Sequence, residues 1–594
     1  MGDPARERLR RSWAWWFRRE LLPILLRNES LFSGLYGAKG RPNWSVARML
    51  GVCLLQQFED LDDQAALDAL SFDARWQYAL DLAREDAYLS RRSLVDFRGR
   101  LVVHDSEGVL MRQVFDEVCE AGLADLKLST VHQRLDSTLI TSAIRRRGRL
   151  SLARETLRVF LGSLERDAYE RVSDAIRAWH AADEGWERHV AGAEATSALQ
   201  ELGGWVRELV DQFSGDTRVR ATEPYELLVR LLREHAVALG QVAPASDPDS
   251  DSDSDPDSGP GSDSDPDSDS DPGPDSDSDS DSERRMAPSA SAERKAKRKQ
   301  RAKKNRAKTG KARFWSPHDP DASCGHKGLG YHAHFTETCR NETTELLTDY
   351  DVVTAADTDV GRAMPVIERL AQRGRPAVEL YADGGYPTPA QLLAARAAGT
   401  ELYAPVHRGK LSDDVFARTD FAWDGDRVVA CPAGQQPTRH GQRASDTAAR
   451  RRSLHVFFDA DTCGACAERT RCPVRQPNNK RSREYRLDIA DELVARDQRW
   501  ADQKTESWRA QYRIRAGVEA TMSELKRAHG LGRLRVRRLP RVRLQVAFKA
   551  IACNIKRWAR AVARPAGLAA CAIALVLAAW RRPPDPVPSP HAIL

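Results

Sequence analysis

A stretch of alternating Asp and Ser, residues 247–283, limits how this chain can fold more than any other feature. It contains 15 Asp and one Glu, and neither Lys nor Arg. Such a segment has nothing apolar to bury and its like charges repel, so we expect a solvated, disordered linker. Residues 284–313 follow with 14 Lys and Arg against one Glu, which predicts either nonspecific contact with nucleic acid or a further charged linker.

The charge and length of the remaining sequence indicate a multidomain protein with a polyanionic partner. A length of 594 residues exceeds what one hydrophobic core organises, so two to four domains are expected. The net charge is only +6, but residues 501–564 alone contain 17 basic and 4 acidic side chains. Such a concentration of positive charge favours binding to nucleic acid.

Cysteine usage and apolar segments indicate the compartment. The ten Cys are mostly scattered, and the N-terminus lacks the long apolar run of a secretory signal. Residues 565–580 are uncharged and rich in Ala, but they are shorter than the roughly 20 residues that span a bilayer. We therefore expect a cytoplasmic protein without stable membrane association.

Hydrophobic periodicity predicts helices on both sides of one early strand. Residues 1–123 carry apolar side chains three and four positions apart, with Ser45 as a helix cap. This region either reads DNA, as helix-turn-helix proteins do, or serves as a scaffold. Residues 129–143 alternate as a strand does, with Asp136 at the end of the strand, and residues 150–243 return to helical spacing.

Strand and helix patterns resume after the charged linker. Two strand-like runs, GYHAHFTETC and ELLTDYDVVTAADTD, precede the sequence PAVELYADGGYPTPAQLLAARAAGTELYAP, which predicts strand, turn, helix and strand. Asp383 stands at the end of the first of these strands. Ligands of open α/β sheets gather at such strand ends, whereas an Asp before Gly384 is also a common turn signal.

Four residues near the C-terminus form a polar stripe on a predicted helix. Tyr512, Arg515, Glu519 and Lys526 point within roughly 60° of one another if the segment is one helix. A solvated helix with ion pairs would explain the stripe. Alternatively, Glu519 joins the two strand-end aspartates in a carboxylate cluster that a pair of divalent cations neutralises, as in enzymes that clamp a phosphodiester. The two bases would then hold DNA phosphates, and Tyr512 would stack on a base or bond to a phosphate.

The three acids and their contexts resemble the bacterial insertion-sequence transposases of the DDE type. The signature of that family is tyrosine, two residues, arginine, three residues, glutamate, six residues, lysine, and it is intact from Tyr512 to Lys526. The contexts RLDSTLI around Asp136 and YADGGY around Asp383 are similar to those of the family's two aspartates. The N-terminal RPNWSVARMLGVCLLQQFEDL and the downstream AHGLGRLRVRRL extend the likeness, which covers most of residues 40–123, 129–143 and 316–560.

The resemblance implies a fold, an activity and partners. The fold would be α/β, a ribonuclease H-like catalytic core with a helical N-terminal domain and inserted helical, disordered and Cys-rich segments. Asp136, Asp383 and Glu519 would be catalytic and bind two Mg²⁺ ions, for which Mn²⁺ can substitute. The enzyme would cleave double-stranded DNA at the ends of an insertion sequence and transfer the 3′-hydroxyl into target DNA, as a homodimer in a synaptic complex on the nucleoid. Two alternatives stay open: an inactive, domesticated relative that only binds DNA, and a nuclease of the same fold that does not join strands.

Four cysteines between the second aspartate and the glutamate suggest a separate metal site. Cys463 and Cys466 are separated by two residues, a spacing typical of zinc sites, and Cys472 and Cys431 would complete a tetrahedral structural site. The alternative is four free thiols in a reducing compartment.

These predictions divide the chain into eight segments. They are a helical DNA-binding domain at 1–123, the first core strand at 124–149, a helical insertion at 150–243, a disordered acidic and basic linker at 244–313, the second part of the core at 314–406, a Cys-rich insertion at 407–500, basic C-terminal core helices at 501–564 and a C-terminal tail at 565–594.

Overall fold

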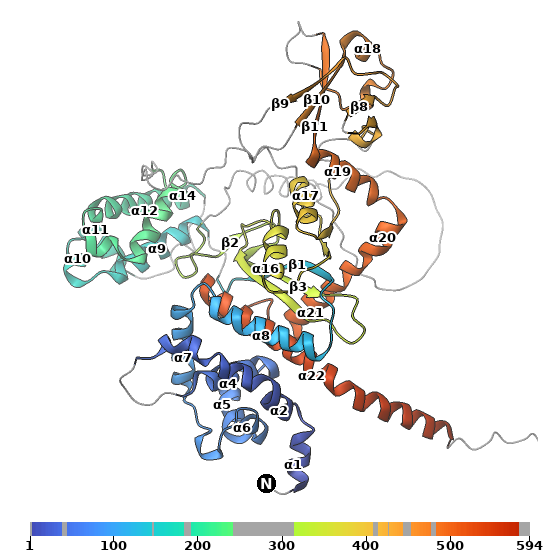
Figure 1. Ribbon diagram of the computed structural model, residues 1–594. Coiled ribbons are helices and arrows are strands. Elements are labelled where there is room, and N and C mark those ends of the chain that lie inside the picture. The colour runs from blue at the N-terminus through green and yellow to red at the C-terminus, as the bar shows by residue number, and fades with distance from the viewer. Residues whose placement is uncertain are drawn as a thin grey trace, which may run out of the picture.

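The structure is a computed structural model in which a central sheet is surrounded by helices (Figure 1). The N-terminal helices lie on one side of the sheet, a helical insertion stands apart from it, and a small β-rich module lies at the far end. The linker predicted from the acidic and basic tracts, together with residues 581–594, lies outside the described residues. The structure describes residues 3–37, 44–144, 148–182, 192–241, 314–407, 414–425, 427–443, 453–476 and 483–580.

The N-terminal region is helical, as its periodicity predicts. The side chain of Ser45 accepts a hydrogen bond from the N–H of Arg48 at 3.4 Å and so caps α4, which begins at the next residue. Asp62 and Ser90 cap α5 and α7 in the same way. The elements are α1 (Asp3–Arg10), α2 (Trp13–Trp16), η1 (Phe17–Leu21), α3 (Leu22–Arg27), η2 (Glu29–Leu35), α4 (Val46–Glu59), α5 (Asp63–Phe72), α6 (Ala74–Ala79), η3 (Arg84–Asp86), α7 (Arg91–His104) and α8 (Val109–Asp125).

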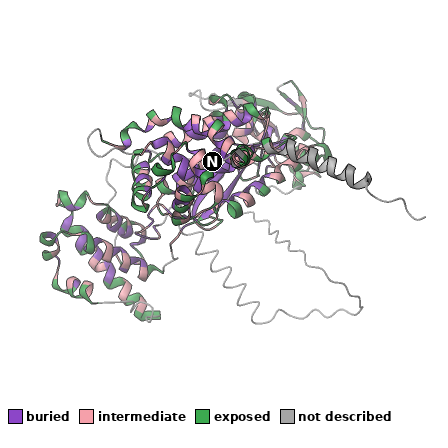
Figure 2. Ribbon diagram, turned by 90° about the horizontal axis from the view of Figure 1, so that it is seen from below, coloured by how far each residue is buried: buried purple, intermediate pink, exposed green. Residues whose placement is uncertain are grey.

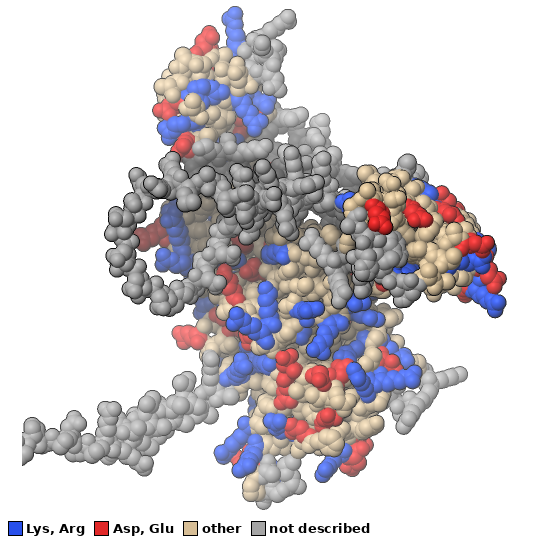
Figure 3. Space-filling view, turned by 180° about the vertical axis from the view of Figure 1, so that it is seen from behind, with Lys and Arg blue, Asp and Glu red and all other residues tan. Residues whose placement is uncertain are grey.

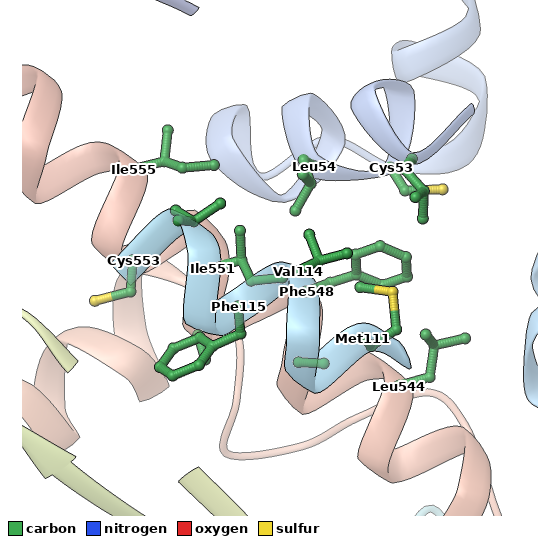
Figure 4. Close-up of a cluster of buried hydrophobic side chains, with 14 of the residues drawn as sticks. Cys53, Leu54, Met111, Val114, Phe115, Leu544, Phe548, Ile551, Cys553 and Ile555 are labelled. Carbon is green, nitrogen blue, oxygen red and sulfur yellow. The ribbon is translucent and has the colours of Figure 1, made fainter. Parts of the chain in front are cut away.

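The hydrophobic core of these helices continues into the rest of the protein. Buried side chains of α4 and α8 pack against the long helix α22 (Leu539–Trp580), among them Leu54, Phe115 and Phe548 (Figure 4). The same cluster reaches one face of the central sheet through Tyr331 and Phe335. Buried residues accordingly form a continuous central region (Figure 2). The N-terminal helices and the sheet therefore share one core.

The central sheet has β1 in its middle. β1 pairs antiparallel with β3, which pairs antiparallel with β2 and β4, and on its other side β1 pairs parallel with β5, which pairs parallel with β6. Helices α16 and α17 cover one face through a second cluster that includes Leu135 and Leu380, while α8 and α22 cover the other. The elements are β1 (His132–Thr141), β2 (Ser323–Cys324), β3 (Leu329–Thr338), β4 (Leu347–Thr354), α16 (Ala363–Gln372), β5 (Glu379–Ala382), α17 (Pro389–Ala397) and β6 (Glu401–Tyr403).

A helical insertion with its own core separates β1 from β2. Phe314, the first described residue after the charged tracts, is fully buried in that core, and its carbonyl oxygen lies 3.2 Å from Nε2 of His235. The chain therefore leaves and re-enters the fold at the same module. The helices are α9 (Arg149–Ser163), α10 (Arg166–Glu170), α11 (Asp174–Ala181), α12 (Gly192–Phe213), α13 (Thr217–Arg220) and α14 (Glu223–His235).

The cysteine-containing segment forms a small β-rich module. Its core includes Phe421, Val456 and Phe458. The elements are η5 (Arg418–Asp420), β7 (Ala422–Asp424), β8 (Arg427–Ala430), β9 (Arg439–Arg443), β10 (Ser453–Asp459), α18 (Ala460–Gly464), η6 (Arg469–Arg471) and β11 (Glu484–Ala490), and α19 (Asp491–Asp502) leads back to the sheet.

The polar stripe does not lie on one helix, contrary to the sequence prediction. The segment is divided into α20 (Glu506–Tyr512), a turn of 3₁₀ helix, η7 (Arg513–Ala516), and α21 (Gly517–Ala528). Helix α22 then continues to Trp580 and includes the first part of the predicted tail. In the described part of the chain, no helix combines the length and apolar character needed to cross a bilayer.

Candidate active site

Two aspartates meet at the edge of the parallel strand pair. Leu135 of β1 lies opposite Ala382 of β5, where the parallel pairing ends. Asp136 is the next residue of β1, and Asp383 follows the last residue of β5. The sequence pattern predicted that Asp136 ends its strand. This prediction is wrong, because β1 continues to Thr141 through its pairing with β3. The parallel pairing with β5 stops before Asp136 while the pairing with β3 continues, so the two carboxylates lie together at the end of the β1–β5 pair.

Glu519 reaches this edge because α21 lies directly against β1. A Cβ atom at Gly517 would lie 1.9 Å from Nη1 of Arg134, so any other residue here would require the Arg134 side chain or α21 to move. Arg134 is itself held by Glu337 at 2.7 Å and donates to the carbonyl of Ile514 at 3.1 Å. A strand residue thus fixes the 3₁₀ turn that separates α20 from α21.

The guanidinium of Arg515 contacts the carboxylates of all three acids. Its Nη2 lies 2.9 Å from Oδ2 of Asp136 and 3.7 Å from Oδ2 of Asp383, and its Nη1 lies 3.1 Å from Oε1 of Glu519. The structure therefore brings together the three acids that the sequence singled out, and it places Arg515 between them.

The acids differ in exposure and in electrostatic surroundings. The side chain of Asp136 is 12% exposed, against 56% for Asp383 and 67% for Glu519. Burial raises the pKa of Asp136 above its ordinary value, although Arg515 and the N–H of Ser137 favour the ionised form. Burial also raises the pKa of Tyr512. The ionised form of Asp136 therefore depends on neighbouring positive charge.

The other members of the stripe take different positions. Lys526 lines an open cavity of about 400 Å³ together with Asp136, Glu519 and Arg527. Tyr512 stacks on Trp508, with ring centroids 4.7 Å apart, and its hydroxyl donates to the carbonyl of Ala382 at 3.0 Å. Tyr512 thus ties α20 to the strand end that precedes the second aspartate.

A second polar cluster beside Asp136 was not predicted from the sequence. Lys327 donates to Oγ of Ser137 at 2.6 Å, and the same hydroxyl lies 3.0 Å from both carboxylate oxygens of Asp359. The lysine sits in the sequence CGHKGLGY, where a Cβ atom at Gly325 would meet the carbonyl oxygen of Ala355 at 1.8 Å. The concentration of glycines around one lysine was the available signal.

The four predicted zinc ligands line one cavity in the β-rich module. Cys431, Cys463, Cys466 and Cys472 surround it, together with apolar side chains such as Phe458. Burial raises the pKa of Cys463 to about 11, and the neighbouring thiols contribute to this rise. The N–H of Gln435 points to Sγ of Cys431 at 3.3 Å. These thiols converge although 31 residues separate the first two in sequence.

Among the described residues, a further group could hold a metal ion by its geometry. It consists of Glu524, His529 and Cys553, whose potential ligand atoms all lie within 4.8 Å of one another. Glu524 is already paired with Arg557 at 2.7 Å, and Lys549 and Lys556 also lie close enough to lower the pKa of His529. This excess of positive charge opposes cation binding.

Comparison with known families identifies two parts of the chain. A model described as transposase DDE domain matches residues 430–559, which include Glu519, and a model described as transposase domain (DUF772) matches residues 16–100. Searches of curated proteins and of solved structures found no match. The two family matches confirm the resemblance seen in the sequence, and enzymes of this family generally use divalent metal ions. The matches support an insertion-sequence transposase of the DDE type, an enzyme that cleaves DNA and transfers its strands.

Proposed function

We propose that Asp136, Asp383 and Glu519 are the catalytic residues and bind two Mg²⁺ ions, which Mn²⁺ can replace. The observation that carries this proposal is the contact of all three carboxylates with one guanidinium, because groups from two strands and a helix reach the same cation. Carboxylate oxygens are the ligands that these hard cations prefer. When bound, such ions activate a water or a 3′-hydroxyl and stabilise the leaving oxygen.

A ribonuclease H-like catalytic core is part of this proposal. Its support is the strand order, in which an antiparallel group, β4, β3 and β1, is continued by the parallel strands β5 and β6. The chain would then assemble this core from both sides of the helical insertion and the charged linker.

Residues around the acids would hold the DNA strand. Lys526 faces the cavity that contains Asp136 and Glu519, where its ammonium would bind a phosphate. Arg515 would bind a second phosphate. Tyr512 has one ring face on Trp508 and its hydroxyl on Ala382, which favours a positioning role over stacking on a base.

The N-terminal helices, residues 1–123, would contribute further DNA contacts. Lys and Arg side chains are interspersed with Asp and Glu on the face seen in Figure 3, which suits a surface that follows a phosphate backbone at some points only. Binding of two element ends would require a homodimer acting on the nucleoid.

The β-rich module would bind one structural Zn²⁺. Its support is the convergence of Cys431, Cys463, Cys466 and Cys472 on one cavity, and thiolates are the ligands of structural zinc sites. The hydrophobic core of the module is small, and small modules commonly need a metal or disulfides for stability.

The proposal for the acids is tested by cleavage and joining of a duplex that carries the ends of the flanking element. The native protein is expected to produce nicks and joined products with Mg²⁺ and none with EDTA. Glu519→Gln is expected to abolish both products while DNA binding persists, whereas the exposed Glu506→Gln serves as a control that retains them. Nicks without joined products would instead identify a nuclease, and full activity of Glu519→Gln would refute the proposed role of this acid.

A further inference from the structure

Arg515 is held by the three acids and by little else. Its side chain is only 17% exposed. Its buried Nε has no hydrogen-bond partner among the residues that the structure describes. The position of the guanidinium therefore depends on the carboxylates of Asp136, Asp383 and Glu519.

The guanidinium also faces the oxygen atoms that a metal ion would need. Oδ1 of Asp136 accepts the N–H of Ser137 at 2.7 Å, and Oδ1 of Asp383 accepts the N–H of Gly384 at 2.5 Å. The Oδ2 atoms of both aspartates face Nη2 of Arg515 instead. The backbone thus fixes one oxygen of each aspartate, and the arginine occupies the other.

We infer that Arg515 is a positioning residue that acts as an internal counterion: it keeps the three acids together before metal binds, and it competes with the metal for their oxygen atoms. This inference rests on the proposed function of the acids. In the absence of a cation the three carboxylates would repel one another. The arginine removes this repulsion, but its charge and its place between the acids oppose entry of a divalent ion.

DNA would release this competition. The cavity beside Asp136 and Glu519 is lined by Lys526 and Arg527, and both acids contact Arg515, so a phosphate bound there would lie near the guanidinium. Arginine binds phosphate as readily as carboxylate through the same planar N–H groups. Transfer of Arg515 from the acids to a phosphate would free both Oδ2 atoms. Metal and DNA would therefore each strengthen the binding of the other.

The test measures metal binding to the full chain without DNA, with Mn²⁺ as the probe and the free ion followed by electron paramagnetic resonance. Arg515→Met is expected to bind Mn²⁺ about tenfold more tightly than the native protein, because a unit charge a few ångströms away affects ion binding by at least this factor. Arg515→Lys is expected to fall between the two, and it provides the same test if the Met variant folds poorly. Arg513→Met, an exposed arginine of the same 3₁₀ turn, should bind like the native protein.

A second arm adds saturating duplex DNA to each protein. DNA is expected to tighten Mn²⁺ binding more in the native protein than in Arg515→Met, since only the native protein has a competing cation to lose. Equal or weaker Mn²⁺ binding by Arg515→Met, with and without DNA, would overturn the inference. Failure of the proposed function looks different: Asp136→Asn would then bind Mn²⁺ as well as the native protein does, which would show that the ion does not bind at the acids.

Discussion

A methyl group added at Gly517 should move Glu519 away from the two aspartates. The new Cβ would lie 1.9 Å from Nη1 and 2.6 Å from Cζ of Arg134. Arg134 cannot easily yield, because its side chain is only 13% exposed and is bound to Glu337 at 2.7 Å. The φ angle of Gly517 is −62°, which alanine adopts freely, so the effect of Gly517→Ala is steric.

The expected magnitudes follow from this clash. Overpacking of a fixed site costs about 1 to 3 kcal/mol, and the better helix propensity of alanine returns up to about 1 kcal/mol. We therefore expect a net loss of up to about 3 kcal/mol in the free energy of unfolding. A displacement of α21 by about 1 Å would lower the cleavage rate about a hundredfold.

Denaturant unfolding and DNA cleavage measure these two effects separately. Gly99→Ala, in helix α7, is a matched control because no atom lies within 4 Å of the added methyl group. It should leave cleavage unchanged and stabilise the protein slightly. If Gly517→Ala unfolds and cleaves like the native protein, Arg134 does not set the position of α21. The same conclusion follows if Gly517→Ala costs as much stability in an Arg134→Ala background as in the native one.

Three further predictions concern stability. Burial and nearby bases lower the pKa of His529 to about 3, so the folded state binds fewer protons than the unfolded state below about pH 6.5. The free energy of unfolding should therefore fall as the pH decreases from about 6.5 towards 3, by at most about 1.4 kcal/mol per pH unit. Urea unfolding at several pH values should show a weaker pH dependence for His529→Gln. Arg418→Met should lower the free energy of unfolding by about 3 to 5 kcal/mol at pH 7, as measured by guanidinium unfolding. The substitution leaves the carboxylate of Asp497, which is 0% exposed, without its partner at 3.1 Å. An unchanged unfolding midpoint would show that Arg496 alone neutralises Asp497. A zinc chelator, or Cys466→Ser, should remove one bound zinc per chain and lower the melting temperature of the β-rich module; a native protein without zinc would support free thiols instead.

The sequence could predict most of the elements of the site but not the contacts between them. Periodicity located the strands around Asp136 and Asp383, and the family signature located Glu519. The position of Asp136 within its strand was missed because the length of β1 is set by its pairing with β3, which follows far along the chain. The 3₁₀ turn after Tyr512 was missed because Arg134 fixes it, a residue 380 positions away from the carbonyl of Ile514 that it contacts.

Roles that depend on long-range packing could not be read from local patterns. The contacts of Arg515 with the three acids were not predicted, and its contact with a DNA phosphate stays a prediction. The spacing between Lys327 and Asp359 in the sequence did not indicate that both contact Ser137, because this contact depends on the turn between β2 and β3. The convergence of the four cysteines could be predicted from the sequence, because cysteines are few and three of the four lie close together in the chain.

The shared core of the N-terminal helices and the sheet fixes the distance between these helices and the three acids. Trp558 of α22 is buried against Trp16 and donates to Asp125 of α8 at 2.7 Å, so packed side chains, rather than a hinge, join the two regions. DNA bound by the N-terminal helices would lie at a constant distance from the three acids. The distance along the DNA between the recognised sequence and the cleaved bond would therefore also be constant. Loosening this joint, as in Trp558→Ala, should scatter the position of the cut before it abolishes cutting.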